Sequence, residues 1–289
     1  ISDVEEQNRI DISNKTSYMF KSWSSENSPI LPIFQIEKNK NNTYKLWVHT
    51  NSIAERLELS SKKNIQIFFN RFQSFPLLDN WQNYLSDEIS IAAKFNKSEI
   101  NEAISLCLDI NSENEIINWS FHLTKVKCSL VVENQHIEAL LTRKNKARIT
   151  SRILKPIKDY VEDLEKIIEI SNEFRKNQLL NGKIELPKSN NNIESLKELL
   201  IHNPADFSKE YFEPLNNHDI QTYISPLLYE ANLIWFNHSN NFGLNNASYI
   251  SQKLDYVNVS EIIKNSELID SNIELNENGT LSFTKLVQL

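Results

Sequence analysis

Glycine is scarce in this 289-residue chain, which contains only Gly182, Gly243 and Gly279. Average usage of about 7% would place roughly twenty glycines in a chain of this length. Loops that hold nucleotide phosphates against the backbone need clustered glycines, because a Cβ atom would prevent the close approach. The sequence therefore excludes P-loop NTPases, Rossmann dehydrogenases and protein kinases.

Apolar and polar residues alternate in the first half of the chain. In residues 43–50, TYKLWVHT, the Tyr, Leu and Val side chains alternate with Lys, Trp and His, as in a strand that buries one face. Trp47 and His49 share the other face, which we expect to point outward. Strands are expected at Ile33–Ile36, Thr43–Thr50, Ala103–Ile110 and once or twice within Ile116–Val131, with polar turns at Asn39–Asn42 and Asn111–Glu115.

The second half of the chain has the period of amphipathic helices. Apolar residues recur at helical spacing at Ile157, Tyr160, Val161, Leu164, Ile167 and Ile168. Gly182 follows where a helix C-cap is expected, and a second helix is expected over Leu227–His238. We predict an α+β fold, an antiparallel sheet with packed helices. It forms one domain over residues 1–289, with a linker at 189–192.

The composition is that of a globular protein, with 40% hydrophobic and 24% charged residues. No apolar run approaches the roughly 20 residues that a membrane-spanning helix needs. The opening residues ISDVEEQNRID are acidic and lack the apolar core of a signal peptide. We therefore expect a cytoplasmic protein without a membrane partner. Because the chain starts at Ile1 and ends TKLVQL, we also expect a piece of a longer protein.

The two cysteines indicate neither a disulfide framework nor a zinc site. Cys107 and Cys128 lie in the apolar stretches SLCLDI and KVKCSLVV. A cysteine in such surroundings usually behaves as a small buried hydrophobic residue. We expect both thiols to be reduced and to lie in the core.

Five segments, in this order, carry a resemblance to a known family. They are an Arg-x-Asp opening at Asn8–Ile12, a hairpin ending in Val-His at Ile36–His49, paired strands at Ala103–Phe121, an Arg- and Gly-containing stretch at Phe174–Pro187, and a later helical segment at Glu230–Gln252. Together they resemble the catalytic domain of the ribonuclease II (RNB) family. The resemblance implies a 3′-to-5′ exoribonuclease fold that binds single-stranded RNA.

The departures from the family pattern fall on its metal-binding carboxylates. The family has a leading Asp and then an Asp-x-Asp-Asp cluster just before the hairpin strand, and closely spaced carboxylates of this kind hold the divalent ions that assist phosphodiester hydrolysis. Here Pro29, Leu31 and Pro32 stand in place of the cluster, and Glu26 and Glu37 are the nearby acids. We therefore expect no catalytic residues and no bound metal.

Cations of the family pattern are missing as well. Gln178 stands at the place of a helix-ending Arg, and Ile250 replaces the Arg of a Tyr-Arg segment. The segment Ser225–Tyr229 begins like the family's Ser-Pro-x-Arg-Arg-Tyr motif but contains no Arg. These losses also indicate impaired catalysis.

One stretch, residues 143–158, is strongly basic although the net charge of the chain is −7. Its cations are Arg143, Lys144, Lys146, Arg148, Arg152, Lys155 and Lys158, with no acidic residue among them. Such a run either contacts RNA phosphates or forms a solvated loop before a helix. The sequence leaves both interpretations open.

These observations favour a ribonuclease II-like RNA-binding domain that is catalytically impaired and needs no cofactor. The candidate RNA-binding residues are Arg9, Trp47, His49, Arg143, Lys144, Lys146, Arg148, Arg152, Arg175, Glu230, Tyr249 and Gln252. Two alternatives remain: an active Mg²⁺-dependent exoribonuclease with ligands from elsewhere in the chain, and a protein-interaction scaffold that has lost contact with RNA.

Overall fold

In a computed structural model, the chain folds into two compact units. Unit 1 comprises Ile1–Glu173 and His218–Leu228, and unit 2 comprises Phe174–Asn217 and Tyr229–Leu289. The structure describes residues 6–21, 31–39, 42–52, 75–77, 80–83, 87–143, 149, 151–180, 188–189, 212–213 and 220–241. The single-domain boundary expected from the sequence stays a prediction.

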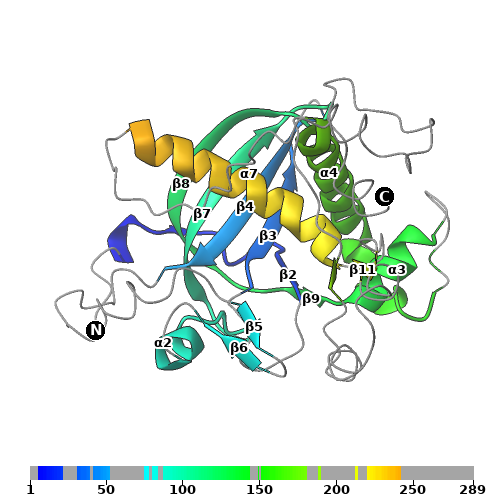
Figure 1. Ribbon diagram of the computed structural model, residues 1–289, viewed down its shortest axis with the longest axis horizontal. Coiled ribbons are helices and arrows are strands. Elements are labelled where there is room, and N and C mark those ends of the chain that lie inside the picture. The colour runs from blue at the N-terminus through cyan, green and yellow to red at the C-terminus, as the bar shows by residue number, and fades with distance from the viewer. Residues whose placement is uncertain are drawn as a thin grey trace, which may run out of the picture. The chain divides into compact units, whose positions relative to one another are not determined.

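A seven-stranded sheet dominates unit 1 (Figure 1). Its order is β1-β8-β7-β4-β3-β2-β9. The strands are β1 (Ile10–Asp11), β2 (Tyr18–Phe20), β3 (Ile33–Lys38), β4 (Tyr44–Asn51), β7 (Asn101–Ile110), β8 (Ile116–Val126) and β9 (Leu130–Val132). Two short antiparallel pairs lie apart from it: β5 (Phe75–Leu77) with β6 (Asn80–Gln82), and β10 (Lys188–Ser189) with β11 (Phe212–Glu213).

The expected strands are confirmed, and the middle of the sheet is antiparallel as predicted. Neighbours from β8 through β2 run antiparallel. The two outermost pairings, β1 with β8 and β2 with β9, are parallel, so the sheet is mixed. Local alternation indicates a strand and not its direction, so the sequence did not reveal the two parallel pairings.

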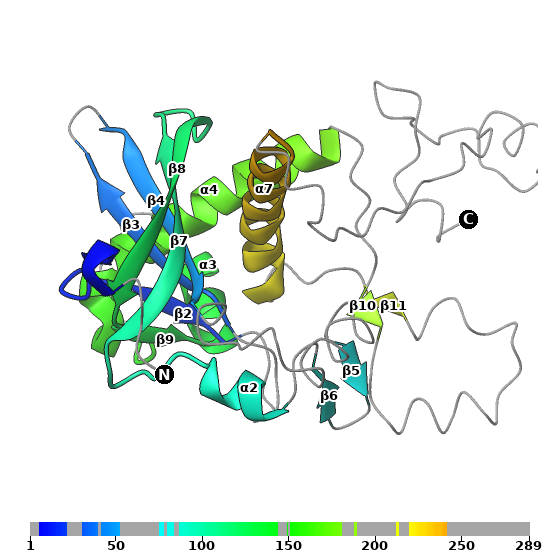
Figure 2. The same ribbon diagram turned by 90° about the vertical axis from the view of Figure 1, so that its left-hand side faces the viewer.

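Both predicted helices exist (Figure 2), and the second is longer than the sequence indicated. The first is α4 (Val161–Leu180), preceded by the 3-10 helix η4 (Lys155–Tyr160). The second is α7 (Ile220–Asn241), which contains Pro226. The shorter helices are η1 (Glu6–Asn8), α2 (Asp87–Ala92) and α3 (Asn134–Leu141). No helix in the described part of the chain is long and apolar enough to cross a membrane. The expected C-cap at Gly182 lies outside the described residues.

One face of the sheet and α4 together form the main core. Leu46 and Val48 on β4 are buried, as are Phe34 on β3 and Leu108 on β7. The register places these side chains on the same face. The predicted helical stripe is buried as well, at Ile157, Val161, Leu164, Ile167 and Ile168.

Polar contacts join this sheet face to α4. The Tyr18 hydroxyl donates to Asp163 Oδ2 at 2.6 Å, and the Tyr18 and Tyr160 rings meet edge to face at 6.0 Å. Burial raises the pKa of the Asp163 carboxyl above its usual range. The helix is thereby anchored to strand β2.

Candidate functional site

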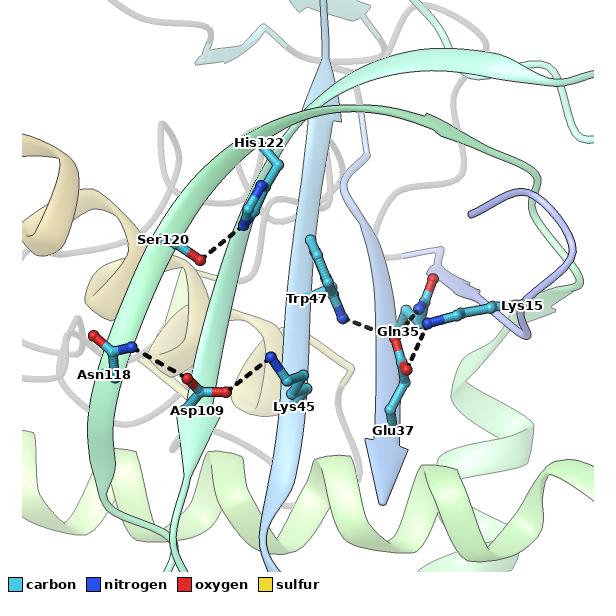
Figure 3. A network of polar contacts seen from close by, with 9 residues as sticks. All are labelled: Lys15, Gln35, Glu37, Lys45, Trp47, Asp109, Asn118, Ser120 and His122. Atoms are coloured by element: carbon cyan, nitrogen blue, oxygen red, sulfur yellow. Dashed lines mark hydrogen bonds and ion pairs between the residues drawn. The ribbon is translucent and has the colours of Figure 1, made fainter. Parts of the chain in front are cut away.

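The opposite face of the sheet carries a set of polar side chains, which we call the polar face (Figure 3). It consists of Lys15, Gln35, Glu37, Lys45, Trp47, Asp109, Asn118, Ser120 and His122. The register of four strands brings these residues together. One row runs Glu37, Lys45, Asp109, Asn118, and the next runs Gln35, Trp47, Cys107, Ser120.

The two carboxylates of the polar face are fully engaged with side-chain donors. Glu37 accepts from Lys15 Nζ at 2.6 Å, from Gln35 Nε2 at 2.7 Å and from Trp47 Nε1 at 3.0 Å. Asp109 is paired with Lys45 at 3.3 Å and also accepts from Asn118 Nδ2. Each carboxylate is therefore neutralised by a lysine, and a metal ion would have to displace these partners.

Trp47 and His49 share a strand face, as predicted. The expectation that their side chains point outward to solvent is wrong. Trp47 is 7% exposed and His49 is 0% exposed. An apolar cluster that includes Met19, Ile33 and Trp47 itself covers this end of the face. Alternation within one strand reveals that two residues share a face and does not reveal what packs on it.

His49 belongs to a buried hydrogen-bonded chain. Its Nδ1 lies 2.6 Å from Ser105 Oγ, which lies 2.6 Å from Thr124 Oγ1. Burial lowers the pKa of His49 to about 3, so the imidazole is neutral near pH 7. The centroid of the Trp47 ring lies 6.0 Å from that of His49 and 5.4 Å from that of His122. Of these three rings, that of the half-buried His122 is the most accessible.

Apolar packing occupies the described end of the stretch in which the sequence predicted a lost carboxylate cluster. Leu31 is half-buried and packs against the apolar cluster, whose members include Ile12, Met19 and Cys128. Pro32 is also half-buried. Among the residues that the structure describes, no three His, Cys, Asp or Glu side chains are grouped so that they could hold a metal ion. Pro29 and Glu26 lie outside the described residues.

The two cysteines are confirmed as free, buried thiols. Cys107 and Cys128 both belong to the apolar cluster. Burial raises the pKa of the Cys107 thiol to about 11, so it is protonated near pH 7. A protonated, buried thiol is a poor nucleophile and a poor metal ligand.

The candidate arginines of unit 1 differ in their surroundings. Arg9 is buried and donates to the Ala103 carbonyl at 3.2 Å and to Ser52 Oγ at 3.0 Å. Arg143 forms an ion pair with Glu165, whereas Arg152 is exposed. The other candidates of the basic run, Lys144, Lys146 and Arg148, lie outside the described residues. A role of these residues in RNA binding stays a prediction.

In unit 2, two residues from the family comparison meet. Gln178 is buried and its Nε2 donates to Glu230 Oε1 at 2.7 Å. The hydrogen-bond partner of Glu230 in this pair is therefore a neutral amide. Arg175 is half-buried on the same helix, and Tyr249 and Gln252 lie outside the described residues.

Sequence reasoning missed most of the polar face. Gln35, Lys45, Asp109, Asn118 and Ser120 were not among the expected site residues. Each lies at an alternating position of a correctly predicted strand. Their proximity depends on strand order and register, which alternation alone does not supply.

The fold is one found in solved ribonuclease structures. RNase R of Mycoplasma genitalium in complex with double-stranded RNA matches with a TM-score of 0.59 and 14% identity, over 89% of this chain and 47% of that chain. The same enzyme with ribose-methylated single-stranded RNA matches at 0.58 and 13%, over 83% and 36%. The Dss1 exoribonuclease active-site mutant of Candida glabrata matches at 0.59 and 12%, over 82% and 30%.

The chain belongs to the RNB domain family, whose model matches residues 9–288. This confirms the resemblance seen in the sequence, and the α+β fold class is confirmed by the solved structures. No curated protein matches the chain. The chain spans less than half the length of the solved ribonucleases described above.

Proposed function

We propose that this chain is an RNA-binding domain of the ribonuclease II type that does not hydrolyse RNA. Membership of the RNB family supports the fold and the general ligand class. The absence of hydrolysis is a separate proposal, and it depends on the chemistry of a single stretch before β3.

The packing of Leu31 is the observation that carries the proposal. In the family pattern this position belongs to the carboxylate cluster, and hard divalent cations such as Mg²⁺ need oxygen ligands. Here an aliphatic side chain rests on other apolar side chains. Phosphodiester hydrolysis of this type relies on metal ions to activate water and neutralise developing charge. Apolar packing at this position supplies neither function.

The polar face is the surface that we propose for RNA contact. It offers amide, hydroxyl and imidazole groups from Asn118, Ser120 and His122, which suit the edges of unstacked bases. Its two lysines are each paired with a carboxylate, so little net positive charge remains. We therefore expect recognition of single-stranded RNA with a shallower salt dependence than that of a basic groove.

RNA hydrolysis is tested by incubating the chain with 3′-extended, 5′-labelled single-stranded RNA and either Mg²⁺ or Mn²⁺. The expected result is intact RNA after incubation times in which an active RNB enzyme trims it completely. Metal-dependent release of mononucleotides, abolished by EDTA, would support the alternative of an active exoribonuclease with replaced ligands.

RNA binding is tested separately by fluorescence anisotropy at low and high salt. We expect Lys45→Ala to weaken binding and to reduce the salt slope by up to about 0.7. Lys38→Ala is the matched control, because Lys38 is an exposed lysine on the neighbouring strand whose register places it on the other face of the sheet. Equal effects of the two substitutions would exclude the polar face. No binding at any salt concentration would favour the protein-interaction scaffold.

A further inference from the structure

Three exposed cations lie where the helical layer of unit 1 begins. Arg152 belongs to the turn before η4, and Lys155 and Lys158 belong to η4 itself. Consecutive members are three residues apart, which is one turn of a 3-10 helix, so they project from the same side of the segment. We call these three residues the cation row.

The backbone beneath the cation row is held by apolar anchors and local hydrogen bonds. Leu154 and Ile157 lie between the cations in the chain and are buried, at 1% and 5% exposure. The Ser151 carbonyl accepts from the Lys155 amide at 3.1 Å, and the Leu154 carbonyl accepts from the Ile157 amide at 3.1 Å. Pro156 fixes a further φ angle at about −65°. Because this backbone is already ordered, a ligand can bind the cations without first ordering the segment.

The charges of the cation row are exposed on an acidic protein, whose net charge is −7. In the part of the chain that the structure describes, none of the three side chains forms an ion pair or a hydrogen bond. By contrast, Lys15, Lys45 and Arg143 each pair with a carboxylate. A local concentration of positive charge attracts anionic ligands even when the sum of charges is negative. The cation row therefore suits a ligand that carries several negative charges.

The cation row and the polar face lie on different layers of unit 1. The segment that starts with η4 continues into α4, and Tyr160 and Asp163 of this segment contact Tyr18. Tyr18 is paired with Phe34, and both side chains lie on the buried core face of the sheet. The polar face is the opposite face (Figure 3). A ligand on the cation row is therefore bound separately from the groups that suit unstacked bases.

We propose that the cation row binds phosphates of the single-stranded RNA backbone, as a second RNA contact beside the polar face. This inference rests on the proposed RNA function. Arginine can hold a phosphate through two parallel hydrogen bonds, and lysine acts on it as a point charge. Each lysine of the polar face is neutralised by a carboxylate, so we assign most of the salt-dependent part of RNA binding to the cation row.

Fluorescence anisotropy of the full chain with labelled single-stranded RNA, over a range of salt concentrations, tests the proposal. Lys155→Ala/Lys158→Ala is expected to weaken binding about three- to tenfold at about 50 mM salt. It should also reduce the salt slope by about 1.4, which is about 0.7 for each lost phosphate contact. Lys155→Arg/Lys158→Arg retains both charges and should preserve the slope. Circular dichroism verifies that the variants fold.

The matched control is Lys38→Ala/Lys97→Ala. It removes the same net charge as the alanine pair in η4, but from exposed positions of unit 1 outside the cation row. A general effect of net charge would weaken RNA binding equally in both double variants. We expect the control to change the salt slope by less than half as much as the substitutions in η4.

A backbone contact also predicts that the loss of affinity does not depend on the bases. Oligo(A), oligo(U) and oligo(C) should all lose the same factor on substitution of Lys155 and Lys158, because phosphate contacts carry no sequence information. Single-stranded DNA of the same length should lose that factor as well, since it carries the same phosphates. A loss confined to one base would assign these residues to base recognition and overturn the proposal.

The possible failures of the two proposals can be told apart. A wild-type chain that binds no RNA overturns the proposed function and this inference together. A wild-type chain that binds RNA, with a salt slope that Lys155→Ala/Lys158→Ala leaves unchanged, overturns this inference alone. If that variant instead loses binding to vesicles containing phosphatidylserine while its RNA binding is unchanged, the cation row is a site for anionic lipid and the RNA assignment is wrong.

Discussion

Substituting Leu31 with Asp places a carboxylate in the stretch before β3, and the structure predicts a loss of stability rather than a metal site. Leu31 is half-buried against the apolar cluster. Full burial of a leucine contributes about 1.5–3 kcal/mol, so partial burial loses about 1–2 kcal/mol. A carboxylate held in this environment also has a raised pKa. Each unit by which its pKa rises destabilises the folded, charged protein by about 1.4 kcal/mol. Together these two effects predict a destabilisation of about 3 kcal/mol at pH 7.

Urea unfolding at pH 7 and pH 4, with and without Mg²⁺, measures this effect. Because burial raises the folded pKa of the new Asp above its unfolded value, the penalty is present above the folded pKa. It decreases as the pH falls toward the unfolded value near 3.9. Leu31→Ala is the control that removes apolar contact without adding charge. It should cost about 1–2 kcal/mol with little dependence on pH.

Two results would refute this account. One is a Leu31→Asp variant as stable as the wild type. The other is a variant that millimolar Mg²⁺ stabilises although it does not stabilise the wild type. Either result would mean that a carboxylate at residue 31 reaches a hydrated, ligand-competent position. The apolar packing of Leu31 would then be a poor guide to the chemistry of this stretch.

Three further predictions concern buried and half-buried groups of unit 1. The depressed pKa of His49 means that the unfolded chain binds a proton that the folded chain excludes, so the free energy of unfolding should decrease below about pH 6.5 by up to about 1.4 kcal/mol per pH unit. In urea titrations His49→Gln should reduce this pH dependence, and an unchanged dependence would contradict the depressed pKa of His49. Tyr18→Phe removes the hydrogen bond to Asp163 and should cost about 1–2 kcal/mol at pH 7, whereas a neutral effect in thermal unfolding would show that the bond contributes nothing. His122→Ala should weaken binding of single-stranded RNA by about 1–3 kcal/mol if the ring stacks on a base, and anisotropy with unchanged affinity would exclude stacking there.

Sequence patterns predicted the elements of this fold better than their arrangement. The stretch from Thr43 to Thr50 became β4 almost residue for residue, because alternation in a half-buried strand is a local property. The parallel pairings of β1 and β9 were not predicted. They involve short strands, and their partners come from distant parts of the chain.

The same distinction applies to the candidate site. The proposal that Pro29, Leu31 and Pro32 stand in place of the family's carboxylate cluster comes from the sequence, because a side chain's ability to bind a metal is intrinsic to its chemistry. The three donors around Glu37 are not visible there. Lys15, Gln35 and Trp47 reach it from a loop and two adjacent strands.

By itself, the sequence determined the family, the α+β class and the reduced state of Cys107 and Cys128. Tertiary structure alone decided that Trp47 and His49 are buried and that the two outermost strand pairings are parallel. The physical reason is the range of the interactions. Periodicity and side-chain chemistry are encoded within a few neighbouring residues, whereas burial and strand pairing depend on what the rest of the chain places against each face and edge.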